Sequence, residues 1–243
     1  IIPMSKIAFV FPGQGSQYVG MCKAFYDQYP IARQLFEEAD DALGFSLTKM
    51  CFEGPEADLR LTYNTQPAIL TASTICGEIL KQHGVSADIA AGHSLGEYSA
   101  LVNAGAMKFA DAVRIVRQRG QFMQEAVPVG EGSMSAVMGL ANEKIVEICQ
   151  QVETETGLPV QAVNFNCPGQ VVISGTEEGI DAACAKLLEA GAKRAMKLKV
   201  GGAFHSPLMQ PAKDELAAAI EVAKFETPIC PIYQNVDGKP HTD

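Results

Sequence analysis

The sequence feature that most constrains the fold is a short strand that turns directly into a helix through a G-x-S-x-G motif. Small residues from Asp88 to Ala91 predict the strand, and Glu97 to Ala104 predict the helix. Between them lies the segment 92–96, GHSLG, in which side chains at the glycine positions would collide with the neighbouring strand and helix. Such a turn holds its serine, here Ser94, in a strained and exposed position.

The rest of the first half also alternates strand and helix. An apolar strand from Lys6 to Phe11 ends in a glycine-rich turn at residues 12–15. Helical patterns follow, at residues 21–43, 66–83 and 109–124. This alternation predicts an α/β fold with a parallel sheet that helices cover on both faces.

The pattern changes after Pro128. The predicted order is a strand at 133–139, a helix at 142–155 capped by Asn142, two strands at 160–166 and 170–175, a helix at 177–190 and a strand at 192–200. This βαββαβ order is the ferredoxin-like arrangement. We therefore expect a small subdomain at 128–200, inserted into a larger one made of residues 1–127 and 201–243.

Composition and charge exclude several classes of function. The 243 residues carry a net charge of −9, which argues against binding nucleic acid, because that binding depends on neutralising phosphates. No apolar run approaches the ~18 residues of a membrane span, and no signal peptide precedes the first strand, so we expect a cytoplasmic protein. We also expect a monomer.

Cysteine and histidine spacing indicates neither disulfides nor a metal. The seven cysteines form no close pair, so we expect reduced and mostly buried thiols. The four histidines show no metal-ligand spacing either. A catalytic cysteine is an alternative nucleophile, but the motif around Ser94 is the stronger signal.

Ser94 is the predicted nucleophile, and the Leu95 N–H is the natural first donor to a developing oxyanion. A serine needs a base, and four histidines are candidates. His93 is adjacent, but neighbours on a sharp turn point in different directions, and His83 and His241 lie where solvated histidines are common. His205, in a glycine-rich loop after the small subdomain, follows the serine in chain order and is the predicted base.

Arg119 is a candidate for binding a carboxylate. It lies on a helix that also carries Arg114 and Arg117, for which a solvated face is the favoured interpretation. Next to Gly120 and an apolar stretch, the Arg119 guanidinium could grip a carboxylate with two hydrogen bonds. The spacing alone does not separate this role from a solvated face.

Five blocks of sequence, in order, resemble one enzyme family. They are FPGQGSQ from Phe11, GHSLGEYSAL from Gly92, the pair Arg119-Gly120, NFNCPGQVVISG from Asn164, and AFHS from Ala203. Together they are similar to the malonyl-CoA:acyl carrier protein transacylase family, over residues from about Ser5 to the end. The resemblance implies an α/β-hydrolase-like parallel-sheet core with a ferredoxin-like insertion.

The same resemblance implies roles for single residues. Ser94 would carry the acyl group and His205 would act as base and acid, while Gln14 and the Leu95 amide would form the oxyanion pair. Four further positions would bind substrate: Arg119 for the malonyl carboxylate, Phe204 against a methyl branch at the malonyl C2, and Asn166 and Gln170 on the wall of the cleft. No cofactor or metal is implied.

The resemblance has one departure. Members of the family usually continue for several dozen residues, which include a backbone carbonyl that orients the catalytic histidine. We therefore expect the larger subdomain to be incomplete at its C-terminal end. No aspartate here is a convincing substitute, since Asp237 lies in the turn-forming segment 235–238.

Three other functions compete with malonyl transfer from coenzyme A to acyl carrier protein in fatty acid synthesis. They are a stand-alone acyltransferase of a polyketide synthase, a serine thioester hydrolase and a non-catalytic binding fragment. The hydrolase has no need of a buried cation such as Arg119.

Because acyl carrier proteins are acidic, docking on an acidic chain requires a local basic patch. The predicted patch is Lys193, Arg194, Lys197 and Lys199, with the three lysines on one face of a strand. A solvated outer face explains the same residues equally well.

Overall fold

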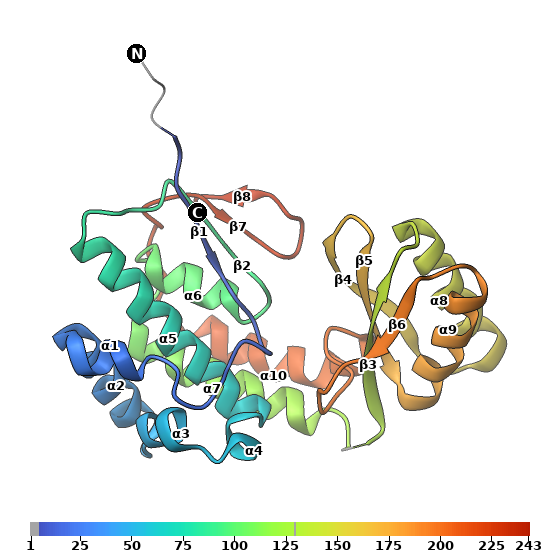
Figure 1. Cartoon of the computed structure of the whole chain (residues 1–243), viewed down its shortest axis with the longest axis horizontal. Helices are drawn as coiled ribbons and strands as arrows, with labels where there is room; N and C mark the ends of the chain where they lie inside the picture. The colour runs from blue at the N-terminus through green and yellow to red at the C-terminus, as the bar shows by residue number, and fades with distance from the viewer. Residues whose placement is uncertain (1–4, 129) are drawn as a thin grey trace. The chain divides into compact units, whose positions relative to one another are not determined.

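The computed structural model describes residues 5–128 and 130–243. The chain divides into two compact units (Figure 1). We call Ile1–Gly120 with Ala218–Asp243 the core unit, and Gln121–Ala217 the small unit. The two boundaries fall inside the helices α7 (Phe109–Glu125) and α10 (Gln210–Glu221).

The core unit is built on a four-stranded sheet in the order β1-β2-β7-β8. Its strands are β1 (Ala8–Phe11), β2 (Ile89–Gly92), β7 (Ile232–Tyr233) and β8 (Pro240–His241). The first three are parallel, and β8 is antiparallel to β7. The predicted mixed α/β architecture with a parallel sheet is confirmed. Neither β7 nor β8, which have only two residues each, was predicted.

The described residues before α7 form six helices of the core unit. They are α1 (Lys23–Gln28), α2 (Pro30–Leu43), α3 (Leu47–Glu53), α4 (Glu56–Leu59), α5 (Thr62–Gln82) and α6 (Gly96–Asn103). The single helix predicted at 21–43 is wrong, because the chain is extended at Tyr29, with φ −116° and ψ 121°. Proline disfavours helical geometry in the residue before it, which here is Tyr29, and Pro30 then starts α2. Neither α3 nor α4 was predicted.

Arg117 has a structural role that the sequence analysis missed. Pro67 lies inside α5 and has no N–H to donate to the Tyr63 carbonyl one turn earlier. The Arg117 Nη1 donates to that carbonyl at 2.9 Å and also to the Asn64 side chain. Its guanidinium stacks 4.5 Å from the Tyr63 ring centroid. The favoured interpretation of Arg117 as a solvated face is therefore wrong, whereas Arg114 is exposed and pairs with Asp111.

The small unit contains a four-stranded antiparallel sheet in the order β4-β5-β3-β6. Along the chain its elements are β3 (Gly132–Met138), α8 (Asn142–Thr156), β4 (Val160–Cys167), β5 (Gln170–Thr176), α9 (Glu177–Glu189) and β6 (Arg194–Lys197). The prediction that Asn142 caps α8 is wrong. Ala141 is the N-cap, without a side-chain hydrogen bond, and Asn142 is the first helical residue.

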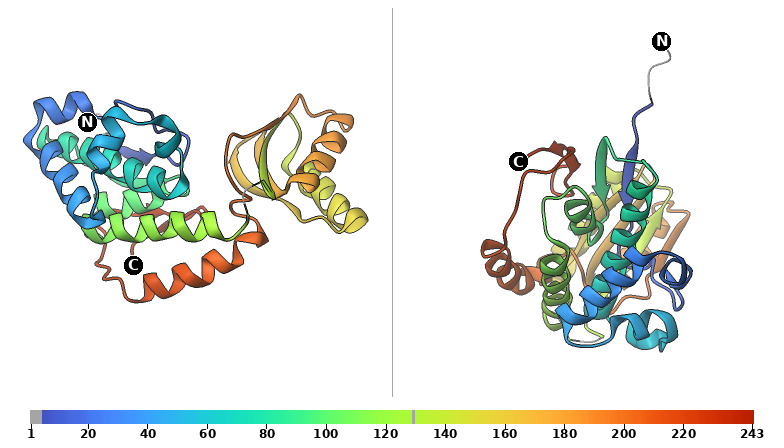
Figure 2. Two further views of the ribbon diagram at one scale, coloured as in Figure 1. Left: turned by 90° about the horizontal axis from the view of Figure 1, so that it is seen from below. Right: turned by 90° about the vertical axis from the view of Figure 1, so that its left-hand side faces the viewer.

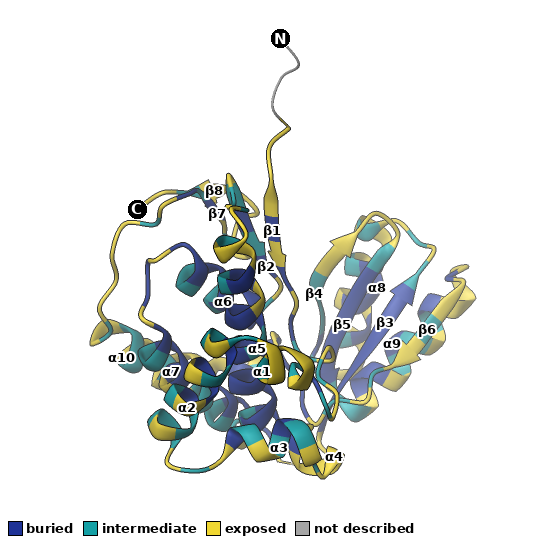
Figure 3. Cartoon of the chain, turned by 60° about the vertical axis from the view of Figure 1, so that its left-hand side comes forward, coloured by how far each residue is buried: buried dark blue, intermediate teal, exposed yellow. Residues whose placement is uncertain are grey.

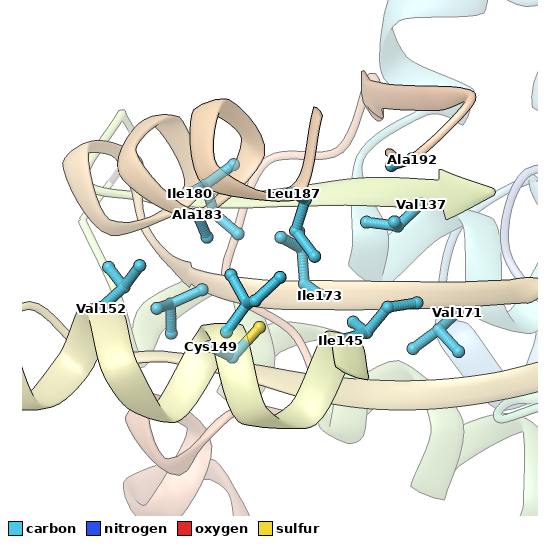
Figure 4. Close-up of a cluster of buried hydrophobic side chains, with 12 residues drawn as sticks. Val137, Ile145, Cys149, Val152, Val171, Ile173, Ile180, Ala183, Leu187 and Ala192 are labelled. Atoms are coloured by element: carbon cyan, nitrogen blue, oxygen red, sulfur yellow. The ribbon is translucent and has the colours of Figure 1, made fainter. Parts of the chain in front are cut away.

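One hydrophobic cluster joins the small unit's sheet to its two helices. The helices α8 and α9 lie on the same face of the sheet (Figure 2), and apolar side chains from β3, β5 and both helices point into a common interior (Figure 4). Val137, Ile145, Ile173, Ile180 and Leu187 are all fully buried there. The central strands β3 and β5 are accordingly the buried ones, whereas β6 at the edge is largely exposed (Figure 3).

The cysteines are less buried than predicted. Cys51, Cys149 and Cys230 are buried, but Cys76 and Cys167 are exposed. All seven are free thiols, with Cys22 and Cys184 at intermediate exposure. Among the described residues, no helix is both long and apolar enough to cross a lipid bilayer.

Candidate active site

The turn between β2 and α6 holds Ser94 in a left-handed conformation, with φ 51°. Such a backbone costs roughly 1–3 kcal/mol in a residue other than glycine, so the surrounding structure must enforce it. The two glycines of the motif make the turn possible. A Cβ on Gly92 would lie 1.9 Å from the Gly96 carbonyl carbon, and one on Gly96 would lie 2.2 Å from the Phe11 oxygen. The strand, sharp turn and helix that the motif requires are therefore present.

The glycine-rich loop after β1 packs against this turn. The His93 N–H donates to the Phe11 carbonyl at 3.0 Å, and a Cβ on Gly13 would lie 2.5 Å from the His93 oxygen. This close approach brings the backbone of the loop that carries Gln14 to the serine turn. The Gln14 side chain donates to Thr62 Oγ1 at 3.2 Å, while the Leu95 N–H has no acceptor within the described parts of the chain. That amide is available to an oxyanion.

Arg119, near the end of α7, reaches the nucleophile. Its Nη2 donates to Ser94 Oγ at 3.1 Å, and its Nη1 donates to the Oε1 of Gln66 at 2.8 Å. The guanidinium also lies 5.6 Å from the centroid of the Tyr98 ring. Burial lowers the pKa of Arg119, but Tyr98 and Glu97 act in the opposite direction. A half-buried cation is thus directed at the serine oxygen, within reach of a carboxylate on an acyl group attached there.

Gln66 and Tyr98 were not predicted as site residues. Gln66 is fully buried and orients the guanidinium, and burial raises the pKa of the Tyr98 hydroxyl. In the sequence, Gln66 stands out only as a polar residue just before Pro67 and the apolar run that follows it.

Asn235 is a further residue that the sequence analysis missed. Its Oδ1 accepts from the Ser94 N–H at 2.7 Å, and its Nδ2 donates to the Gly92 carbonyl at 2.6 Å. The Asn235 N–H donates to Glu97 Oε2 at 2.9 Å. The segment after β7 is thereby fastened to both sides of the serine turn. The sequence predicts only a turn here, and Asp237 does accept the Lys239 N–H, at 2.9 Å.

The small unit holds His205 in a second left-handed backbone, with φ 62° and the residue exposed. Ser206 Oγ donates to the Ala203 carbonyl at 2.7 Å and accepts from the Leu208 N–H, which caps the short 3-10 helix η1 (Pro207–Met209). Phe204, 4% exposed, packs in a hydrophobic cluster with Met123, Met134, Val172 and Met209. Its ring position is therefore set by the core of the small unit. A role in excluding methyl branches stays a prediction.

The other predicted residues of the small unit lie at its surface. Asn166 Nδ2 donates to Gln170 Oε1 at 3.2 Å across the exposed β4–β5 hairpin. Lys197 pairs with Glu177 and with Asp181, the latter at 2.6 Å. The strand β6 covers only Arg194–Lys197, so Lys193 and Lys199 lie outside it and the strand predicted at 192–200 is too long.

A metal site and an apolar cavity are two other kinds of place where a ligand could bind. No cluster of three or more His, Cys, Asp or Glu side chains that could hold a metal occurs among the described residues. An apolar cavity of about 510 Å³ lies in the core unit beside β1, α1 and α5. Its lining includes neither Ser94 nor Arg119, so it is not where the reactive groups gather.

Comparisons with known proteins agree with this geometry. Residues 8–243 match the acyl transferase domain family. The chain is 50% identical over 240 residues to the malonyl CoA-acyl carrier protein transacylase of Bacillus subtilis, covering 99% of this chain and 75% of that protein. It is 49% identical over 241 residues to the Escherichia coli K12 protein of the same name, covering 99% and 77%.

Solved structures give the same result. The malonyl CoA-acyl carrier protein transacylase of Coxiella burnetii superposes with a TM-score of 0.95 at 44% identity, covering 98% of this chain and 75% of that one. A malonyl-transacylase solved in complex with a type II polyketide synthase acyl carrier protein also gives 0.95, at 45% identity, covering 98% and 77%. The chain spans about three quarters of the length of these relatives. It belongs to the malonyl-CoA:acyl carrier protein transacylase family of acyl transferases.

Proposed function

We propose that this chain moves a malonyl group from coenzyme A to the phosphopantetheine thiol of an acyl carrier protein, through an acyl-enzyme on Ser94, in fatty acid biosynthesis. The observation that carries the proposal is the 3.1 Å hydrogen bond from Arg119 to the oxygen of Ser94. It joins a cation suited to a carboxylate with a nucleophile suited to a thioester. The relatives that match the chain are named for this transfer.

The proposed reaction has two halves with the same chemistry. Ser94 Oγ attacks the malonyl thioester carbonyl while His205 takes the hydroxyl proton. The tetrahedral oxyanion receives hydrogen bonds from the Leu95 N–H and from Gln14. When the intermediate collapses, the carbon–sulfur bond breaks and coenzyme A leaves as a thiol with the proton from His205. The carrier's thiol then attacks the Ser94 ester, and the same groups act in reverse.

Arg119 would supply selectivity for acyl groups that end in a carboxylate. Gln66 already holds one side of the guanidinium at 2.8 Å, so the cation does not need to reorganise when malonate arrives. An uncharged acyl group would leave this half-buried cation without a partner, which is costly. In the proposed complex the malonyl carboxylate takes the hydrogen bond that Arg119 Nη2 now directs toward Ser94.

The detailed fold assignment belongs to the same proposal. We assign the core unit to an α/β-hydrolase-like fold, supported by the parallel strands and by the serine turn between β2 and α6. We assign the small unit to a ferredoxin-like fold, supported by its βαββαβ order and its strand order β4-β5-β3-β6. The domain limits predicted from the sequence, 128–200 for the insertion and 1–127 with 201–243 for the core, stay a proposal. The compact units differ from them in that residues 121–127 and 201–217, which include His205, group with the small unit. The proposed location is the cytoplasm.

The proposed docking site for the carrier is the basic end of the small unit. Lys193, Arg194 and Lys199 are exposed, and none of them forms an ion pair within the described residues. Lys197 is already paired with Glu177 and Asp181, so its charge is largely compensated. Reversing Lys193 should therefore raise the KM for carrier protein more than reversing Lys197. If the KM for carrier protein is unchanged in both variants, the carrier docks elsewhere.

A polyketide carrier is the second candidate partner. One relative at 45% identity was solved with a type II polyketide synthase acyl carrier protein bound. The chemistry of the two partners is identical, and only the docking surface of the carrier differs. Comparing kcat/KM for a fatty acid carrier and a polyketide carrier with the same malonyl-CoA would decide between them.

The test of the proposal is to follow where the acyl group goes. Labelled malonyl-CoA is incubated with the protein, with and without holo acyl carrier protein. We expect the label on the enzyme alone in the first case and on the carrier in the second. Release of free malonate at the same rate in both cases would instead indicate a thioester hydrolase, and no label on either protein would indicate a non-catalytic binding fragment.

A further inference from the structure

We infer that Asn235 is a positioning residue that fixes the reactive conformation of Ser94. The inference rests on the proposed function, because it assigns a role in the same site. Asn235 is far from Ser94 in sequence and follows β7, the strand that pairs with β2. Its side chain contacts the backbone on both sides of the nucleophile, at the Ser94 N–H and the Gly92 carbonyl.

The two hydrogen bonds require a group that both accepts and donates. The amide Oδ1 accepts at 2.7 Å and the amide Nδ2 donates at 2.6 Å. A carboxylate could accept from Ser94 but could not donate to Gly92, and a shorter side chain would do neither. The Asn235 backbone is itself fixed, because its N–H donates to Glu97 Oε2 at 2.9 Å. Glu97 lies in the first turn of α6, so the contacts bracket the whole serine turn.

These contacts act on the geometry of the nucleophile. The left-handed φ of 51° at Ser94 is unfavourable for a serine. The two hydrogen bonds that the Asn235 side chain forms with Ser94 and Gly92, which we call the amide clamp, oppose relaxation of this backbone. The clamp also occupies the Ser94 N–H, which leaves the next amide, that of Leu95, as the donor for an oxyanion. Arg119, which would bind the malonyl carboxylate, is held by Gln66 and not by Asn235. Loss of the clamp should therefore slow acylation while malonyl-CoA binding changes little.

The test compares Asn235→Ala, Asn235→Asp and the control Val236→Ala, whose parent side chain is 84% exposed. In single-turnover acylation by malonyl-CoA, Asn235→Ala should lower the rate constant by up to ~10²-fold, which is what a misplacement of about 1 Å of a reacting group can cost. The malonyl-CoA concentration for half-saturation should stay within about twofold. Val236→Ala should match the unmodified protein in both.

Asn235→Asp gives a readout that a merely structural role would not produce. When its carboxyl is protonated, it can donate to the Gly92 carbonyl and accept from Ser94, as the amide does. Its rate relative to the unmodified protein should therefore rise as the pH falls from 7 toward the ordinary aspartate pKa of about 3.9. Taking the ratio removes the protonation of His205, which both proteins share. A ratio that does not change with pH would overturn the inference.

A measurement without catalysis separates this inference from the proposed function. Hydrogen exchange at the Ser94 amide should be slow in the unmodified protein and at least ~10-fold faster in Asn235→Ala, because the acceptor is lost. If the protein forms no acyl-enzyme but Ser94 shows this change, the proposed function fails and the clamp stands. If acylation proceeds and neither rate nor exchange differs between Asn235→Ala and Val236→Ala, the inference is wrong.

Discussion

The core unit and the small unit each hold one predicted catalytic residue in a left-handed backbone, but they do so in different ways. Ser94 has φ 51° and is held by Asn235, which lies 141 positions away in sequence. His205 has φ 62° and lies in a loop closed by Ser206 and Ala203, its near neighbours. The backbone of Ser94 therefore depends on a contact between distant segments of the chain. The backbone of His205 depends on a local turn next to a hydrophobic cluster.

This contrast predicts that the His205 loop tolerates substitutions better than the Ser94 turn. The loop of His205 keeps its local hydrogen bonds whenever the small unit is folded. The turn of Ser94 needs β7 to be in register with β2, and β7 has only two residues. We therefore expect destabilisation of the core unit to distort the Ser94 turn more readily than an equal destabilisation of the small unit distorts the His205 loop.

The largest expected effect is that of His205→Ala, which should slow acylation of Ser94 by ~10²–10⁴-fold, the usual worth of a positioned base. His93→Ala is the matched control, because His93 is the exposed histidine next to Ser94 in the sequence and its N–H is held by the Phe11 carbonyl at 3.0 Å. Single-turnover rates for both variants, with folding checked by circular dichroism, make the comparison. A greater loss for His93→Ala would show that the base has been assigned wrongly.

Removing the cation should come next in size. Arg119→Ala should lower the preference for malonyl-CoA over acetyl-CoA by ~10²-fold or more, since breaking a buried charge pair costs about 3–5 kcal/mol. Arg114→Ala is the control, because that arginine is exposed and pairs only with Asp111. The ratio of kcat/KM for the two substrates is the measurement. Equal losses for both substrates would contradict a carboxylate-binding role.

A smaller effect is expected for a methyl branch on the substrate. If the Phe204 ring borders the acyl site, methylmalonyl-CoA should be poorer than malonyl-CoA by ~10–200-fold, the range for one methyl group in a hydrophobic pocket. Comparable kcat/KM values would mean that Phe204 serves only the hydrophobic cluster in which it is 4% exposed.

The smallest expected effect is that of Ser206→Ala. It removes the hydrogen bonds to Ala203 and Leu208 and should cost about 0.5–2 kcal/mol of stability, as loss of a helix cap does. Because the cluster beneath the loop remains, acylation should fall less than in Asn235→Ala. Thermal unfolding and acylation of the two variants, measured side by side, test whether the local loop is the more robust. A larger loss of activity for Ser206→Ala would reverse the comparison.

The sequence could predict what depends on neighbouring residues. The elements around Ser94, the alternation of strands and helices in the core unit, and the element order of the small unit all follow from local patterns and glycine positions. Long-range partners had no comparable signal. Asn235 resembles an ordinary turn residue, and Gln66 is buried by packing of α5. Arg117 bonds the Tyr63 carbonyl, 54 positions away, which the missing N–H of Pro67 leaves without its helical partner. The helix break before Pro30 could have been predicted, because proline restricts the backbone of the residue before it.

The acyl-enzyme on Ser94 is tested most directly by locating the acyl group on the protein and then following its transfer. After reaction with malonyl-CoA, peptide mapping should find malonyl on Ser94, none on the seven cysteines, and none in Ser94→Ala. Adding holo acyl carrier protein should remove it from Ser94 and leave malonyl on the carrier's thiol. A malonyl adduct that persists in Ser94→Ala, or one on Ser94 that the carrier cannot accept, would contradict transfer through Ser94.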